Sequence, residues 1–170
     1  MLERMLRAAR LESSLYEEVE ADPTAGGQAL FIVVAVGLIS ALGMALAYPG
    51  DQSVGAVIAN VISTVLSWVV WAFLTLWIGK TFLAGEETQS DMGEMLRTLG
   101  FAHTPQLLVG LVFIPVAGPV LALLGSLWKL VAGIVAIRQA LDFSTSRAIL
   151  TAFFGFMVVV VFRLVVRLIF

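Results

Sequence analysis

Five stretches of this sequence are long and apolar enough to cross a membrane, and they constrain the fold more than any other feature. They cover about residues 28–48, 54–79, 95–114, 119–141 and 148–170. A hydrocarbon layer about 30 Å thick needs roughly 20 mostly apolar residues at a helical rise of about 1.5 Å per residue. The alternating pattern of a membrane strand is absent. The sequence therefore predicts an all-α, polytopic bundle of five transmembrane helices.

The composition agrees with a membrane protein and excludes several other classes. Hydrophobic residues make up 60% of the chain, charged residues 13%, and cysteine is absent. A soluble domain has roughly 25% charged residues. These values exclude a soluble globular enzyme, a disordered chain, a disulfide scaffold and a cysteine-based zinc site. The net charge of −2 gives no reason to expect a nucleic-acid partner.

Residues 1–27 precede the predicted transmembrane domain, which covers residues 28–170. From Leu2 to Glu20 the sequence has no proline or glycine, and its apolar residues recur at helical spacing on one side. This pattern predicts one amphipathic helix on the cytoplasmic surface, with Arg4, Arg7 and Arg10 available to anionic headgroups.

The second half of the N-terminal segment is acidic and includes Glu18, Glu20 and Asp22. Two interpretations remain open for it: an ordinary solvated face, or a surface that meets a basic partner. Asp22 and Pro23 together are typical of a helix start, and they predict that the first span begins soon after them.

Lysine and arginine residues set the expected orientation. One side of the predicted bundle receives most of them: Arg4, Arg7, Arg10, Lys80, Arg97, Arg138 and Arg147. The other side receives Arg163 and Arg167, close to the C-terminus. Cytoplasmic loops carry the excess of basic residues. We therefore expect a cytoplasmic N-terminus and an outward C-terminus, in the cytoplasmic membrane if the cell is prokaryotic.

The order of several motifs resembles the Yip-domain family, small multi-pass membrane proteins named for interaction with Ypt/Rab GTPases. The motifs are the acidic stretch 16–23 with Glu18, Glu20, Asp22 and Pro23, then Gly79-Lys80 at the end of the second span, then Gly100-Phe101 followed by Pro105, then Ile114-Pro115 with Gly118, and Leu127-Trp128. The family has a Gly-Tyr pair before the proline, so Phe101 stands where tyrosine is usual. The later motifs look like those of the short bacterial-type members.

The resemblance implies five spans and a non-enzymatic scaffold or interaction protein that binds lipid, itself or other membrane proteins. Eukaryotic members take part in vesicle traffic and bind Rab GTPases. They carry long cytosolic N-terminal regions that this sequence lacks, so a small GTPase partner is not expected. In that branch an N-terminal acidic residue and a membrane-proximal lysine are important. Glu18 or Glu20, and Lys80, occupy comparable positions.

Lys129 is the most costly residue in the predicted spans. It lies about ten residues, or roughly 15 Å, from either end of its span. A lysine at the centre of a membrane helix costs about 2.5–3.5 kcal/mol on the insertion scale. Two interpretations stay open: a site for an anion or headgroup, and a solvated structural lysine.

His103 is the only histidine and lies within the third span. Its imidazole could ligate a haem iron or a chlorin magnesium, or relay a proton. The commoner role is a hydrogen bond to a carbonyl left free near Pro105. We predict no cofactor or metal beyond this candidate, and bound lipid is expected.

Two further patterns concern helix packing. Asn60 begins a polar stripe along the second span, which is typical of hydrogen bonds between helices and could also line a polar path. Small residues at Gly37 and Ala41 on the first span, and at Gly125 and Gly133 on the fourth, predict close packing or dimerisation.

Signatures of an enzyme are missing: the sequence has no metal-ligand cluster, no paired intramembrane aspartates and no glycine-rich phosphate loop. The leading hypothesis is therefore the non-enzymatic membrane scaffold. The alternatives are a small transporter or channel with a polar cavity around Lys129, and an accessory subunit of a bioenergetic or pigment-binding membrane complex.

Overall fold

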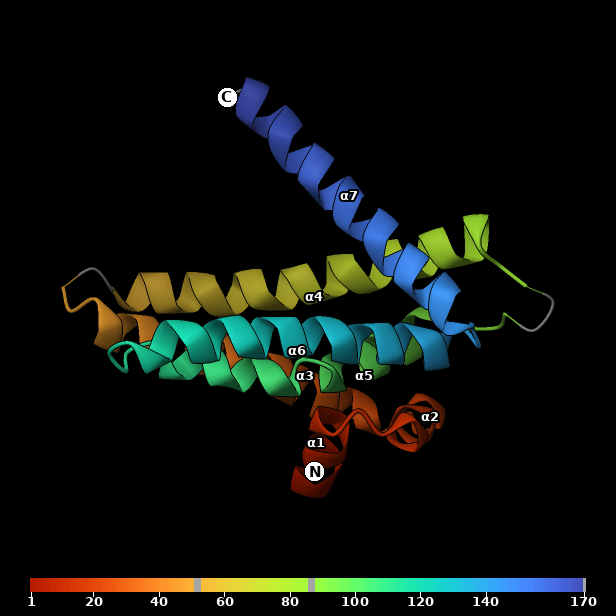
Figure 1. Cartoon of the computed structure of the whole chain (residues 1–170), viewed down its shortest axis with the longest axis horizontal. Coiled ribbons are helices and arrows are strands. Elements are labelled where there is room, and N and C mark those ends of the chain that lie inside the picture. Colours follow the sequence, from red (N-terminus) through yellow and green to blue (C-terminus); the bar gives the residue numbers. More distant parts are fainter. Residues whose placement is uncertain (51–52, 86–87, 170) are drawn as a thin grey trace.

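The computed structural model describes residues 1–50, 53–85 and 88–169, apart from the side chains of 162, 163 and 166–169. Every regular element in these ranges is helical (Figure 1). In chain order they are α1 (Leu2–Ala9), α2 (Ser13–Ala21), α3 (Ala25–Ala47), α4 (Val54–Phe82), α5 (Met92–Phe101), the 3-10 helix η1 (Thr104–Leu111), α6 (Ala117–Ala140) and α7 (Thr145–Ile169). The prediction for Arg163 and Arg167 concerns side chains outside the described residues.

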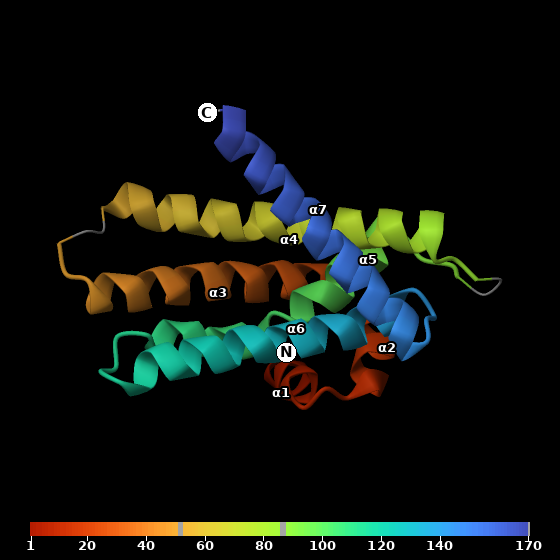
Figure 2. The same cartoon turned by 45° about the horizontal axis from the view of Figure 1, so that its top comes forward.

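Three of the helices are long and apolar enough to span a membrane. They are α3, α4 and α6, with 23, 29 and 24 residues, which correspond to about 34–44 Å of helix. All three run along the long axis of the molecule, and α3 packs directly against α4 (Figures 1 and 2). The described part of α7 adds a shorter apolar stretch, Thr145–Val161. The chain is thus an all-α protein with membrane-spanning helices.

The third predicted span is not one continuous helix, so that part of the prediction is wrong. The chain forms α5, leaves the helix at Ala102, and continues as η1. Pro105 lies at the start of η1, where its missing N–H and its steric demand on the preceding residue oppose a regular α-helix. Helix α5 and η1 together still fill the space between α3 and α6.

The N-terminal segment also differs from the prediction, because it forms two helices instead of one. Leu11 adopts a left-handed backbone with φ of 62° and ends α1. Its N–H donates to the Ala8 carbonyl over 3.0 Å, and the Glu12 N–H donates to the Arg7 carbonyl over 3.1 Å. This is a Schellman ending, a position where glycine is usual. The reversal folds α2 back toward α1.

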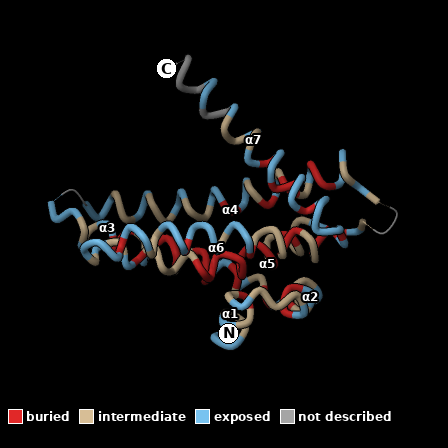
Figure 3. Tube along the Cα trace, viewed as in Figure 1, coloured by how far each residue is buried: buried red, intermediate tan, exposed pale blue. Residues whose placement is uncertain are grey.

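Buried residues gather at one end of the molecule, where α2, α5 and the facing parts of α3 and α6 meet (Figure 3). Leu15, Tyr16 and Val19 of α2 are fully buried there. In contrast, large apolar side chains are exposed along the long helices, including Leu66, Phe73 and Leu130. Exposed apolar helix surfaces of this extent are typical of segments that face lipid.

Helix α7 begins against α4 and α6 and then diverges from both. Gly155 lies close to α4, where an added Cβ would be 3.4 Å from the Trp71 ring. Beyond this contact α7 runs away from the bundle (Figures 1 and 2). Phe154 and Phe156 are about half exposed. The outer faces of α7 and α4 are therefore not covered by the rest of the chain.

Candidate functional site at the N-terminal helices

Ion pairs fasten α1 to α2. The Arg4 guanidinium lies 2.8 Å from Glu18 Oε1 and 3.0 Å from Asp22 Oδ2. Arg7 lies 2.6 Å from the other oxygen of Glu18 and 3.1 Å from Glu12 Oε2. Two of the three arginines expected to face headgroups are thus occupied by carboxylates of their own chain.

These contacts change the acid–base properties of the acidic residues. The hydrogen bond from Arg7, with that from Arg4, holds the pKa of Glu18 below its usual value. The Thr24 hydroxyl and backbone N–H both donate to Asp22 Oδ1, and they help to lower the pKa of Asp22. Helix α3 begins at Ala25, two residues later than a helix capped by Asp22 would, and Pro23 is exposed between the two helices.

Arg97 anchors the end of α2 to α5. Its Nε donates to the Val19 carbonyl over 2.9 Å, and its Nη2 donates to the Glu20 carbonyl. The last carbonyls of a helix have no partner within the helix, so a cation there satisfies them and opposes the helix dipole favourably. The sequence shows only the charge of Arg97 and not this anchoring role, because Arg97 lies 78 positions from Val19 and 77 from Glu20.

Glu20, on α2, is half-buried near α5 and the end of α6, where other acidic side chains lie nearby. Desolvation is the main cause that raises its pKa to about 7, and repulsion from Glu94, Asp142 and Glu17 acts in the same direction. Arg97 partly offsets these effects. The Glu17 carboxylate also accepts a 2.6 Å hydrogen bond from Gln139 of α6. Glu20 is therefore poised to change its charge near neutral pH.

Lys80 and the start of α5 form a second anchored region at the same end. The Lys80 ammonium donates to the Ser90 carbonyl over 3.0 Å. Asp91 and Glu94 form a reciprocal capping box, with bonds of 2.8 and 2.9 Å. The Asp-x-x-Glu spacing is a known signal for a helix start, and it was the signal that could have placed α5 correctly.

Lys129 follows the point where α6 packs against the break between α5 and η1, the break that carries His103. Gly125, one turn before Lys129, lies against η1, since an added Cβ would be 3.0 Å from the Pro105 carbonyl oxygen. His103 is 4% exposed, and its Nδ1 lies 2.8 Å from the Leu99 carbonyl oxygen.

The described residues contain no cluster of three or more metal-ligating side chains. His103 therefore stands alone as a candidate ligand. The Gln106 side-chain oxygen, in the next turn, is buried without a hydrogen-bond partner among the described residues. This region is polar, and its observed bonds are to the backbone.

Glycines bring the membrane helices into backbone contact. A Cβ on Gly37 would lie 3.1 Å from Val61 Cα, and a Cβ on Gly100 would lie 2.5 Å from the Ala29 methyl group. Ala41, beside Gly37 on the same helix, and Phe101, beside Gly100, are both buried. At Gly133, in contrast, no described residue lies within 4 Å of an added Cβ, so none of the described helices packs closely there.

The polar side chains of α4 are bonded to helix backbones. Asn60 donates to the Gly37 carbonyl of α3 over 2.8 Å. Thr64 and Thr75 donate to carbonyls one turn earlier on α4, also over 2.8 Å. These bonds satisfy side-chain donors and link α3 to α4, as intramembrane polar groups commonly do.

Comparison with known proteins assigns the chain to a family. The model of the Yip1 domain matches residues 12–166, which is nearly the whole chain and includes α2, the three long helices and the α5–η1 segment. Comparisons with curated proteins and with solved structures gave no match. This coverage confirms the resemblance seen in the motifs: the chain belongs to the Yip1-domain family of membrane proteins.

Proposed function

We propose that this protein is a non-enzymatic membrane scaffold, which associates with lipid and with other membrane proteins or further copies of itself through helix packing. The observation that carries the proposal is the divergence of α7. Its described apolar side chains beyond Gly155, among them Phe156, Val161 and Leu164, are exposed, as are those on the outward face of α4, and α7 runs away from the bundle there (Figure 1). Membership in the Yip1-domain family supports the same role.

The outward face of α4 has the composition of a helix–helix interface. Gly55, Ala59, Ser63 and Ser67 are all exposed and recur every four residues. Small residues at this spacing let two membrane helices approach closely. The small residues of α3 are, in contrast, used inside the chain, as Gly37 shows by its contact with Val61. We therefore assign association to α4 and α7.

A matched pair of variants tests this assignment in native lipid. Ser63→Leu places a large side chain on the exposed stripe of α4, and Ser126→Leu makes the same change on an exposed face of α6. We expect Ser63→Leu to lower the mass of the purified assembly and to release co-purifying proteins, and Ser126→Leu to leave both unchanged. A wild-type protein that purifies as a strict monomer without partners would refute the scaffold role.

We further propose that the N-terminal helices face the cytoplasm. Arg4, Arg97, Arg138 and other basic residues gather at the end of the bundle that carries α2 and α5, which is the distribution expected of a cytoplasmic side. The chain has no cysteine, so single cysteines can be placed cleanly. We expect Tyr48→Cys to react with an impermeant maleimide in intact cells and Ser14→Cys to react only after lysis. The reverse pattern would invert the orientation.

A small transporter or channel is the second candidate, and the observation in its favour is the buried polar region of His103 and Gln106 where η1 meets α6. Measurement of solute flux in liposomes distinguishes it from the scaffold. Flux that is unchanged by Lys129→Ala and by His103→Ala would exclude a transport path through this region.

A further inference from the structure

The exposed apolar surface is much shorter on α6 than on α4. On α4, large apolar side chains are exposed from Val54 to Trp77, which corresponds to about 35 Å of helix. On α6, the exposed large apolar side chains end at Val131, about 21 Å from the start of the helix at Ala117. From there to Ala140, α6 exposes no large apolar side chain. A hydrocarbon layer about 30 Å thick is therefore matched on the α4 face and is too thick for the α6 face.

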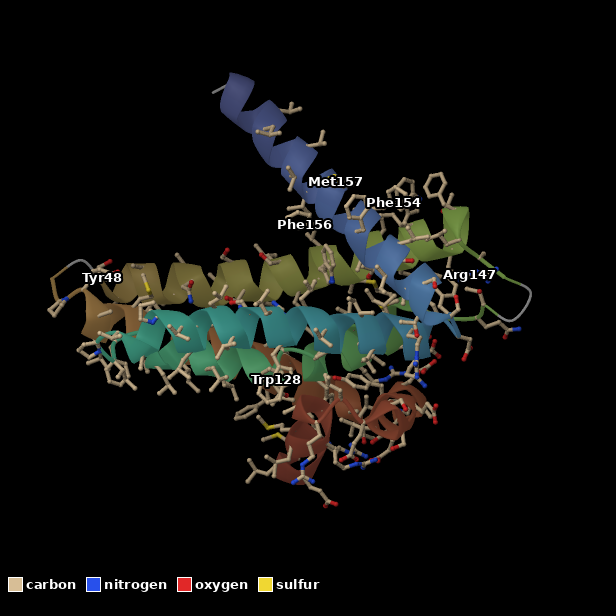
Figure 4. All side chains as sticks on the ribbon, in the orientation of Figure 1. Tyr48, Trp128, Arg147, Phe154, Phe156 and Met157 are labelled. Carbon is tan, nitrogen blue, oxygen red and sulfur yellow. The ribbon has the colours of Figure 1, made fainter. Side chains whose placement is uncertain are left out.

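Helices α1 and α2 lie beside the part of α6 that lacks this surface. Leu11, at the turn between them, lines one groove together with Trp128 and Val131. Glu17 of α2 accepts a hydrogen bond from Gln139, near the end of α6. Trp128 lies on the side of α6 toward α1 (Figure 4). The two helices therefore lie alongside α6, from its middle to its end, and not beyond the end of the bundle (Figures 1 and 2).

Helices α1 and α2 are too highly charged for a hydrocarbon layer. Residues 1–21 carry eight acidic or basic side chains, which are Glu3, Arg4, Arg7, Arg10, Glu12, Glu17, Glu18 and Glu20. Arg10 and Glu17 among them are exposed. A charged side chain within a membrane is costly unless it faces water or the interior of the bundle. The polar layer of the membrane must therefore extend along this face as far as α1.

Helix α1 has the features of a helix that lies in the membrane interface. It runs across the long axis of the bundle, and hence across the direction of the spanning helices (Figure 1). Leu2 and Leu6, one turn apart, are 73% and 60% exposed, and the exposed Arg10 follows one turn later. Such a helix lies in the plane of the interface with its apolar side chains among the acyl chains. The position of α1 thus marks the level of the interface on this face.

We propose that this protein thins the bilayer on the face formed by α1 and α6, and that this face is surrounded by lipids with short acyl chains. A bilayer adapts to a short apolar surface by thinning, and short chains reduce the cost of doing so. Lys129 lies near the inner end of the exposed α6 surface, so the full cost of a lysine in mid-membrane is an upper limit for it. The inference specifies the lipid association of the proposed function, and it requires neither a second copy nor a partner protein.

Two tryptophans report on the two faces separately. Trp128 on α6 and Trp77 on α4 are 42% and 48% exposed. The full-length protein is reconstituted in brominated dioleoyl phosphatidylcholine, diluted with phosphatidylcholine that carries either shorter myristoleoyl or longer erucoyl chains. The signal of each tryptophan is the difference between the wild-type protein and Trp128→Phe or Trp77→Phe.

We expect the short-chain lipid to relieve the quenching of Trp128 at a lower mole fraction than the long-chain lipid. The cost of mismatch per ångström is modest, so the preference should be on the order of threefold. At Trp77 the long-chain lipid should be the better competitor. The same order of the two lipids at both tryptophans would overturn the proposal. Protection of Trp128 from brominated lipid would also overturn it, because a protein would then cover this face.

Nitroxide labels measure the thinning itself. The chain has no cysteine, so Val131→Cys and Phe73→Cys each give a single label, nine residues before the ends of α6 and α4 at Ala140 and Phe82. Helix α4 extends farther than α6 at this end, so in a flat bilayer the label at Phe73 would be the shallower one (Figures 1 and 2). We expect the reverse, with a water-soluble nickel chelate reaching the label at Val131 and not the label at Phe73.

A label at Phe73 that is as accessible to the chelate as the label at Val131, or more accessible, would overturn the proposal. This outcome is separate from failure of the scaffold role. A strict monomer without partners refutes the scaffold, but it leaves the expected difference between Val131 and Phe73 unchanged.

Discussion

Gly43 of α3 and Gly110 of η1 touch through their backbones. A Cβ placed on Gly43 would overlap the carbonyl group of Gly110, and a Cβ on Gly110 would overlap the Ile39 side chain. No flexible side chain lies at the first of these contacts to move aside. The pair therefore fixes how closely the irregular third segment approaches the first long helix.

We predict that Gly43→Ala destabilises the bundle by about 1–3 kcal/mol, because overpacking against backbone forces the two elements apart. Unfolding in a mixed-detergent titration would measure the change. Gly133→Ala is the matched control: nothing lies within 4 Å of its added Cβ, and alanine favours a helix over glycine by about 1 kcal/mol. Equal losses in the two variants would contradict this account of the Gly43 contact.

Arg7 and Glu18 should couple energetically. Removing either partner by Arg7→Gln or Glu18→Gln weakens the link between α1 and α2, and the double variant should lose less than the sum of the two single variants. Hydrogen exchange of the α1 amides in native lipid would provide the measurement. The coupling should shrink at high salt, because both side chains are partly exposed. Additive effects would show that the pair does not hold α1.

Arg97→Gln should release the end of α2. The variant loses the bonds to the Val19 and Glu20 carbonyls, and hydrogen bonds from charged groups contribute about 1.5–3 kcal/mol each. We expect faster proteolysis between α2 and α3 with the long helices intact. Arg97→Lys keeps the charge but loses the guanidinium geometry that reaches both carbonyls. Its rate of proteolysis should lie between those of the wild-type protein and Arg97→Gln. Wild-type proteolysis of Arg97→Gln would contradict the anchoring role.

Docking of α2 should depend on pH through Glu20. Its pKa is raised to about 7 in the folded protein, from an ordinary value of about 4.3. A raised carboxyl pKa favours the folded state at low pH, and this contribution is lost as the pH rises from about 4.3 through 7.

The protection factors of the α2 amides, which correct for the intrinsic pH dependence of amide exchange, should therefore be higher at pH 5 than at pH 8. Glu20→Gln should remove most of this dependence and protect α2 at pH 8, because glutamine carries no charge near Glu94 and Asp142. Glu3→Gln, at an exposed position of α1, is a matched control and should keep the wild-type pH dependence. A pH dependence that is unchanged in Glu20→Gln would assign it to another group.

Lys129→Met should stabilise the protein by up to about 3 kcal/mol, the cost of a lysine at the centre of a membrane helix. No ion pair or hydrogen bond involves Lys129 in the part of the chain that the structure describes. Removal of an unpaired charge from a partly buried site is favourable. A destabilised Lys129→Met would instead show that Lys129 binds an anionic partner in the membrane.

The sequence predicted the class of the protein well because lipid imposes a simple local rule. Uncharged stretches such as 28–48 and 54–79 can bury their backbone polar groups only as helices. The structure confirms long apolar helices there, as α3 and α4. The order of several short motifs along the sequence likewise indicated the family, and the match over residues 12–166 confirms it.

The predictions that are wrong concern two segments whose structure depends on contacts with residues distant in the sequence. The third span was predicted as a regular helix, but Pro105 and the close approach of Gly110 to α3 favour the α5–η1 break. The N-terminal segment was predicted as one helix, but burial of Leu15 and Tyr16 on the bundle favours a reversal at Leu11. Helical spacing alone cannot show such a reversal, because residues on both sides keep the same periodicity.

By itself, the sequence determined that this chain is a helical membrane protein whose lysine and arginine residues are concentrated on one side of the bundle. Both results follow from hydrophobicity and charge, which are local properties of the sequence. Only the tertiary structure decided which charges are free. It paired Arg4 and Arg7 with α2, placed Arg97 on the α2 carbonyls, and left Arg10 without an ion pair among the described residues. These outcomes depend on side chains that meet across the fold, and sequence spacing does not encode those distances.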